Sequence, residues 1–347
     1  MKVLLRNIGT LVSGDLRRPL LDADSLVLRD GVIAGIGRGL DEDADTVIDC
    51  RGTTVMPGLI EMNASPLVAT STAVTTRALE AGITSARVVG LDPYVGLEQR
   101  ESLDNGRRAG PRIFMAGDPI DGRRVRDAGG VSVVSVPELD EALERATLLG
   151  ADFVAARTRL GRSLHPRLTT FAHEHGLRAS TSELTAALFF GYDTLAQLPR
   201  RPYRDVIDAL GLSGLTVLST IGVPATETKS NAQLDRLATE RVNALKAIRR
   251  AGGHVVAGSV IIGTAAVSSL HDEIEQLVRG GFTPFEAWRA ATADAAAALG
   301  IDDVLGTIEP GKLADFAFVA GNPLDDPSAA RAVRRVMRGG RLYEVTR

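Results

Sequence analysis

The sequence contains one cysteine and five histidines among its 347 residues, and this scarcity limits the chemistry available to it. The single cysteine, Cys50, cannot form a disulfide within the chain, and the strand-like run before it indicates a small buried side chain. The sequence also lacks a Gly-x-Ser-x-Gly elbow and any Cys-His pairing. Covalent catalysis therefore has no support in the sequence.

Long apolar runs and concentrated positive charge are missing as well. There is no stretch of about 18 apolar residues, and Met1–Asn7 lacks the apolar core and cleavage site of a signal peptide. A net charge of -3 and a pI near 6.0, without a Lys/Arg-rich arm, argue against nucleic acid as a partner. We expect a cytoplasmic homo-oligomer that binds neither nucleic acid nor membranes.

The sequence pattern at the two ends of the chain is typical of β-strands joined by turns. The N-terminal segment alternates short β-branched runs with turn signals such as Arg29-Asp30-Gly31, and the C-terminal segment ends in a predicted hairpin at 338–341. With 44% hydrophobic and 24% charged residues, the chain is an ordinary soluble protein, long enough for two domains. We predict a β-sandwich formed by residues 1–56 plus 304–347.

Residues 57–303 alternate strand-like runs with helical periodicity, as expected when helices connect parallel strands. The spacing of these runs favours a TIM (β/α)8 barrel over an open doubly wound sheet, since no Gly-x-Gly-x-x-Gly follows the first strand. The clearest helices are expected at 136–149, 166–175, 231–251 and 270–279. The eight strands are expected near 59–63, 85–89, 112–116, 152–156, 178–182, 194–197, 216–219 and 254–258.

Several motifs identify a family resemblance over most of the chain. Val55–Ser65 (VMPGLIEMNAS) resembles the first barrel strand of the amidohydrolase superfamily, which reads Pro-Gly-Leu-Ile-Asp-x-His-x-His. Ala81–Thr84, Gly110–Ile113 and Gly306–Asp315 (GTIEPGKLAD) resemble later parts of the same fold, and the N-terminal stretch is most similar to the enamidase and imidazolonepropionase-like branch. The resemblance implies a TIM barrel with a small β-sandwich.

The same resemblance fails at the metal ligands. Neutral amide and hydroxyl groups are poor ligands for a borderline-soft cation such as zinc, so we expect neither a metal nor another cofactor. The family's ligand positions are occupied by Asn63 and Ser65 on the first strand, Ala155 or Arg157 on the fourth, Ser182 and Gln197 on the fifth and sixth, and Gly258-Ser259-Val260 after the eighth.

The five histidines do not replace these ligands. His173 and His175 are two apart on a predicted helix, so their side chains point in roughly opposite directions and cannot share one ion. His254 begins the eighth strand at the bottom of the barrel, and His271 opens a helix. Only His165, after the fourth strand, is expected to reach the barrel mouth.

The replaced positions still define a pocket, because the active face of a TIM barrel is formed by the C-terminal ends of its strands. Arg157 can supply a permanent positive charge that clamps a carboxylate or stabilises an enolate-like oxygen, or it can pair with an acid such as Asp118. Arg87 and Tyr203 are further candidates for binding the substrate. Tyr203 lies in the loop 199–204, which contains three arginines. Expected hydrogen-bonding residues of the pocket are Asn63, Ser65, Ser182, Gln197 and Ser259.

Proton transfer requires an acid or base in the same place. Glu61 occupies the position of the family's first-strand acid, and it either acts in chemistry or bonds loop amides under the site. Glu183 either acts in chemistry or belongs to the first turn of the next helix. The remaining candidates are Asp118, Asp121 and His165.

Three functions remain open from the sequence. The first is a metal-independent enzyme that acts on a small organic molecule, neutral or anionic, by acid/base chemistry such as cyclisation, isomerisation or elimination. The second is an inactive pseudoenzyme that binds a ligand or an active partner. The third is a hydrolase of non-peptide C–N bonds with an unrecognised site.

Overall fold

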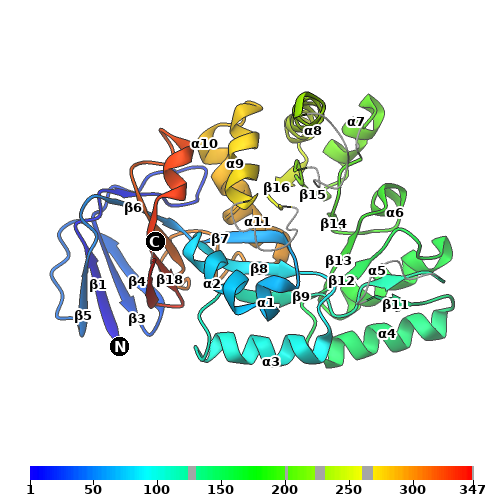
Figure 1. Cartoon of the computed structure of the whole chain (residues 1–347), viewed down its shortest axis with the longest axis horizontal. Helices are drawn as coiled ribbons and strands as arrows, with labels where there is room; N and C mark the ends of the chain where they lie inside the picture. The colour runs from blue at the N-terminus through cyan, green and yellow to red at the C-terminus, as the bar shows by residue number, and fades with distance from the viewer. Residues whose placement is uncertain (124–129, 200–201, 223–230, 260–268, 346–347) are drawn as a thin grey trace.

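The computed structural model describes residues 1–123, 130–199, 202–222, 231–259 and 269–345. In Figure 1 the two ends of the chain lie together on one side of the molecule, and the strands and helices of the middle segment form the other side. Among the described residues, no helix has both the length and the apolar character needed to cross a membrane.

The chain ends form two sheets, as the strand-like runs predict. Their facing sides share one core of buried side chains, including Leu5, Leu26, Phe316 and Phe318, so the sandwich is held mainly by apolar burial. The boundaries of this domain stay a prediction. The first sheet has the order β4 (Val32–Gly37), β3 (Ser25–Arg29), β1 (Lys2–Arg6), β5 (Thr46–Asp49), and the second β19 (Arg341–Glu344), β18 (Val333–Arg338), β17 (Phe316–Ala320), β6 (Thr53–Pro57), β2 (Thr10–Leu11).

The middle segment forms the predicted TIM barrel, and all eight expected strands are present. Two short additional strands, β10 (Ile120–Asp121) and β11 (Val131–Ser132), extend the sheet beside the fourth barrel strand. The barrel strands are β7 (Leu59–Ala64), β8 (Ile83–Val88), β9 (Arg112–Met115), β12 (Phe153–Ala156), β13 (Arg178–Thr181), β14 (Thr194–Leu195), β15 (Thr216–Leu218) and β16 (His254–Val256). Their neighbours within each sheet are parallel.

Three of the helices begin where the sequence provides a capping side chain. Asp92 accepts hydrogen bonds from the first amides of α3, Ser135 caps α4, and Thr283 forms a capping box with Glu286 at α10. The four clearest predicted helices are found within a few residues of their expected bounds. The helices are α1 (Leu67–Thr70), α2 (Thr72–Glu80), α3 (Pro93–Asp104), α4 (Val136–Leu148), α5 (His165–Glu174), α6 (Leu184–Phe189), α7 (Arg204–Leu212), α8 (Asn231–Arg250), α9 (Ser269–Arg279), α10 (Pro284–Ala290) and α11 (Ala293–Leu299).

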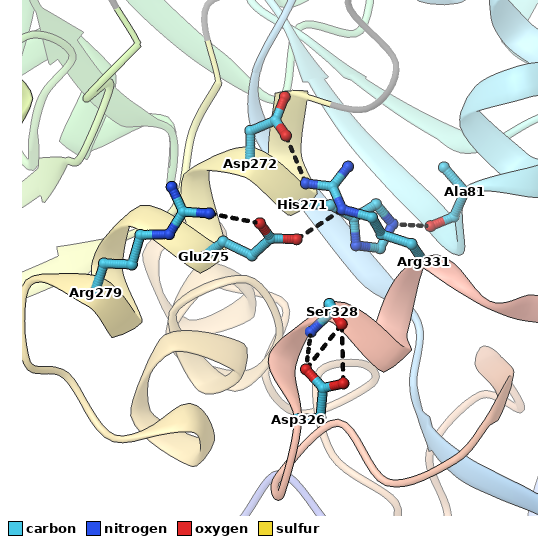
Figure 2. Close-up of polar contacts among 8 residues, drawn as sticks. All are labelled: Ala81, His271, Asp272, Glu275, Arg279, Asp326, Ser328 and Arg331. Carbon is cyan, nitrogen blue, oxygen red and sulfur yellow. Dashed lines mark hydrogen bonds and ion pairs between the residues drawn. The ribbon is translucent and has the colours of Figure 1, made fainter. Parts of the chain in front are cut away.

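The C-terminal segment is also tied to the barrel helix α9. Arg331, at the end of a 3-10 helix (Pro327–Arg331), forms ion pairs with Asp272 and Glu275 of α9 (Figure 2). His271 of the same helix bonds the carbonyl oxygen of Ala81 through Nε2 at 2.8 Å. The ion pairs of Arg331 join α9 to the returning chain, and the His271 bond joins α9 to the end of α2.

A buried ion pair joins the sandwich segment to the barrel. The Asp315 carboxylate accepts a hydrogen bond from Arg112 Nη1 of β9 at 2.9 Å and another from the Gly339 amide at 2.7 Å. The Asp315 side chain is 3% exposed, whereas that of Arg112 is 21% exposed. Asp315 therefore anchors β9 of the barrel to the turn between β18 and β19.

Replacing Asp315 by alanine should lower the free energy of unfolding by about 3 kcal/mol, because it leaves Arg112 and the Gly339 amide without their partner. The measurement is urea denaturation followed by circular dichroism. Asp303→Ala is the control, since Asp303 is exposed, and its effect should stay within about 0.5 kcal/mol. Equal effects of the two substitutions would contradict the anchoring role.

Candidate functional site

A pocket of about 500 Å³ opens at the mouth of the barrel. It brings together five of the residues expected there from the sequence: Asn63, Ser65, Arg157, Ser182 and Gln197. They come from β7, or follow β7, β12, β13 and β14, where the C-terminal ends of parallel strands meet. The mouth is therefore open, and it has not been filled by the side chains that replace the family's ligands.

Three further polar residues line this pocket that the sequence analysis did not select. Ser180 and Thr181 end β13 just before Ser182, and Thr220 follows β15. The Ser-Thr-Ser run at the end of a predicted strand was a usable signal for the first two. Among the described lining residues, Arg157 is the single charged side chain, and none is a carboxylate or an imidazole.

Glu61 lies in the barrel wall, where it binds backbone amides and a hydroxyl. Its carboxylate accepts hydrogen bonds from the amides of Asn63 (2.8 Å) and Ser259 (2.9 Å) and from Ser259 Oγ (2.5 Å). Both Glu61 and Ser259 are buried, and burial raises the pKa of Glu61. Neither residue lines the pocket, so the structure supports the alternative in which Glu61 bonds amides beneath the site.

Two other proposed acids also have structural partners. Asp118 pairs with Arg145 of α4, so it is not the acid that pairs with Arg157 in the alternative left open by the sequence. Asp121 is buried and accepts hydrogen bonds from the amides of Gly122 and Arg159. Neither carboxylate lines the mouth pocket.

Glu183 forms the N-cap of α6 and accepts hydrogen bonds from the amides of Thr185 and Ala186. The sequence left open that Glu183 belongs to the first turn of the next helix; in the structure it is the residue just before that turn, where free amides at a helix start attract a carboxylate. Glu183 also stays outside the lining of the pocket.

His165 does not reach the mouth, in contrast to our expectation. It is the first residue of α5, it is 3% exposed, and its Nδ1 lies 2.6 Å from Tyr192 Oη. Its ring stacks on Phe190, so apolar packing draws it between the helices. Burial lowers the pKa of His165, which favours the neutral ring.

Tyr203 is exposed in solvent and does not line the pocket. It precedes the first residue of α7, where its ring has no apolar surface to cover. Arg200 and Arg201 of the same predicted loop, like Val260 after the eighth strand, lie outside the described residues.

Arg87 is placed inside the barrel below the pocket. It is 2% exposed, its Nη1 donates to the Met62 carbonyl at 3.2 Å, and its guanidinium lies over the Phe153 ring at 3.9 Å. Burial lowers the pKa of Arg87 to about 9. Arg87 is thus a buried cation, and it does not belong to the lining of the pocket.

The donor groups at the mouth do not fit the metal centre that the resemblance implies. None of the five histidines lines the pocket, and His173 and His175 instead bond Asp193 and the Phe171 carbonyl. In the described part of the chain, no group of three or more His, Cys, Asp or Glu residues is arranged to hold a metal ion. The segments outside it contain no histidine or cysteine.

The turn after β15 is held from two sides by buried charged residues. Arg241 of α8 donates through Nη1 to the carbonyls of Thr220 (2.7 Å) and Ile221 (3.2 Å). Glu273 of α9 accepts from Ser219 Oγ (2.5 Å) and from the amides of Ile221 (2.6 Å) and Gly222 (3.3 Å).

These contacts fix Thr220 in an unusual conformation, with φ at 35°. Positive φ is rare for a β-branched residue, and such strain persists only where the surroundings impose it, often at functional sites. The clamp therefore presents Thr220 to the pocket. Sequence reasoning missed it because Arg241 and Glu273 come from helices that gave no sign of contacting this turn.

Comparisons with known proteins agree with the fold. A model of the amidohydrolase family matches residues 203–343. Enamidase from Eubacterium barkeri is 49% identical over 63 residues, which are 17% of this chain and 16% of the enamidase. Ochratoxinase from Aspergillus niger is 33% identical over 121 residues, which are 33% of this chain and 25% of the ochratoxinase. The matched segments thus span a quarter or less of these relatives.

Solved structures match over nearly the whole chain at lower identity. A Xaa-Pro dipeptidase with bound methionine in its active site gives a TM-score of 0.81 at 22% identity, covering 99% of this chain and 100% of that chain. The ochratoxinase of A. niger gives 0.81 at 20% identity, covering 99% and 95%. At this identity the likeness establishes the shared fold.

The clamp makes a prediction about pH. Burial raises the pKa of Glu273 to about 7, although its hydrogen bonds oppose the shift, so the folded protein retains a proton that the unfolded chain releases above about pH 4.5. Wild-type stability should therefore fall as pH rises from 4.5 to 7, by roughly 3 kcal/mol from this group, and then level off.

Glu273→Gln should remove this contribution and flatten the pH dependence in urea denaturation at pH 4.5 to 8. At pH 4.5 the substitution should also weaken stability slightly, because an amide nitrogen cannot accept the hydrogen bond from Gly222. Glu98→Gln, at an exposed position of α3, is the control and should leave the slope unchanged. An unaltered slope in Glu273→Gln would contradict the assignment.

Proposed function

We propose that the chain, which resembles the amidohydrolase family in sequence over residues 203–343 and yet presents no imidazole in the described lining of its barrel mouth, binds a small organic anion there without a metal ion. The observation that carries this proposal is the composition of the pocket. Amide and hydroxyl groups surround a single permanently charged guanidinium in the described lining.

This composition suits an oxygen-rich anion such as a carboxylate. The Arg157 guanidinium offers a planar fork of donors, and Asn63, Gln197 and Ser182 add neutral donors and acceptors that orient a small molecule. A pocket of about 500 Å³ falls within the usual range for small-molecule sites. Binding therefore needs no group beyond those that line the pocket.

Metal-independent acid/base catalysis is a second candidate, favoured by the fact that the named relatives are enzymes. In that case Arg157 stabilises a developing oxyanion, as electrophilic cations do in other enzymes. The described lining offers no carboxylate or imidazole for proton transfer, however, and Glu61 is engaged with Ser259. Ligand binding is for this reason the function that the geometry supports best.

The test compares carboxylates with neutral amides of the same shape at constant ionic strength: acetate with acetamide, benzoate with benzamide, and succinate with succinamide. The melting temperature of the wild-type protein should rise with at least one carboxylate and much less with its amide. In Arg157→Met the apparent affinity for that carboxylate should fall at least tenfold, roughly 1.4 kcal/mol of binding energy.

Arg162→Met is the matched control, because Arg162 is an exposed arginine five residues further along the same connection. It should bind the carboxylate as the wild-type protein does. If Arg157→Met melts far below the wild-type protein yet keeps its carboxylate affinity, Arg157 is structural, and this part of the proposal is wrong.

A further inference from the structure

Arg87 is a buried cation without an anionic partner among the described residues. Its Nη2 is buried and has no hydrogen-bond partner there, and its sole hydrogen bond runs from Nη1 to the Met62 carbonyl. Burial is the one cause that lowers its pKa. No carboxylate of the described chain compensates the charge of this arginine.

Two other shielded arginines of the protein, Arg338 and Arg112, have such partners. Arg338, which is 8% exposed, pairs with Asp104, and Arg112 pairs with Asp315. Charged side chains are almost never fully buried unless they are paired, because desolvation costs several kcal/mol for each ion. The phenyl face of Phe153 offsets part of this cost for Arg87, but it offers no acceptor to Nη2.

The position of Arg87 relates it to the pocket. Arg87 precedes Val89 by two residues, and its contact Phe153 precedes Ala155 by two; both Val89 and Ala155 line the pocket. Phe153 and Ala155 both lie in β12, so they share a face and are separated by roughly 7 Å, whereas Val89 directly follows β8. The Met62 carbonyl that Arg87 contacts lies directly before Asn63, which also lines the pocket. Arg87 therefore occupies the layer of the barrel immediately beneath the pocket floor.

We propose that the innermost end of the pocket receives a carboxylate of the ligand, which pairs with Arg87. The ligand supplies the partner that the described chain withholds, and the guanidinium, which does not itself line the pocket, moves toward the lining residue Ala155 to meet the carboxylate. A guanidinium binds a carboxylate through two parallel hydrogen bonds, so this contact selects carboxylates over amides. The inference rests on the proposed function and adds that the charged end of the ligand lies deepest in the pocket.

The experiment uses the same three carboxylate and amide pairs with Arg87→Met and Arg87→Lys in the full chain. Without added anion, Arg87→Met should melt at or above the wild-type temperature, because it removes an uncompensated buried charge. Its apparent carboxylate affinity should fall at least tenfold while its response to the amides stays at the wild-type level. Arg87→Lys should retain part of the carboxylate response, since it keeps the charge.

The outcomes separate this inference from the proposed function. If Arg157→Met loses carboxylate binding while Arg87→Met and Arg87→Lys keep the wild-type affinity, the pocket binds anions but Arg87 is a structural cation, and the inference is overturned. If no carboxylate stabilises the wild-type protein more than its amide does, both proposals are overturned. Should Arg87→Met fail to fold, Arg87→Lys decides: unchanged affinity and an unchanged preference for carboxylate over amide would contradict the inference.

Discussion

The geometry of the site depends on how the barrel closes between its first and last strands. Among the described residues, no backbone ladder joins β7 to β16. The gap is bridged instead by Glu61, which accepts two hydrogen bonds from Ser259, and by the Asn63 side chain, whose Nδ2 donates to the Ser259 carbonyl at 2.8 Å. Below them, the Ile60 and Ala257 amides donate to the carbonyls of Ala291 and Ala290.

This closure explains why an acid at the family's first-strand position does not make the mouth acidic. The Glu61 carboxylate is engaged in the hydrogen bonds that close the barrel, and Asn63 takes part in them through its backbone amide and its Nδ2. What remains for a ligand is a rim of neutral groups with Arg157, above a layer that contains Arg87. Arg157 at the rim and Arg87 beneath it are thus the cationic side chains described in this part of the barrel, whereas in the resembled family a cation would be the metal.

Much of the fold could be read from the sequence because it rests on local patterns. Parallel strands can be recognised in the sequence as short β-branched runs. The motif around Pro57-Gly58 predicts that Asn63 and Ser65 lie at the mouth, and both residues line the pocket there. The same positional logic placed Ser182 and Gln197 at the mouth, since Ser182 directly follows β13 and Gln197 lies two residues after the end of β14.

The remaining features depend on side chains that meet across long stretches of chain. Three such contacts join separate elements. They are the bond of Ser259 to Glu61, the hydrogen bonds of Arg241 and Glu273 to the turn at Thr220, and the pairing of Asp118 with Arg145. His165 was misplaced for the related reason that the direction of a side chain at a helix start depends on tertiary packing. Such partners are set by the assembled barrel, and no local pattern encodes them.

The central claim is that this barrel mouth works without a metal ion, and the most direct test is the metal content of the purified full-length chain. Elemental analysis after expression in medium supplemented with zinc, iron and manganese should find well below one ion of any of them per chain. A stoichiometric metal that survives dialysis would contradict the account, because it would require ligands that the described mouth does not provide.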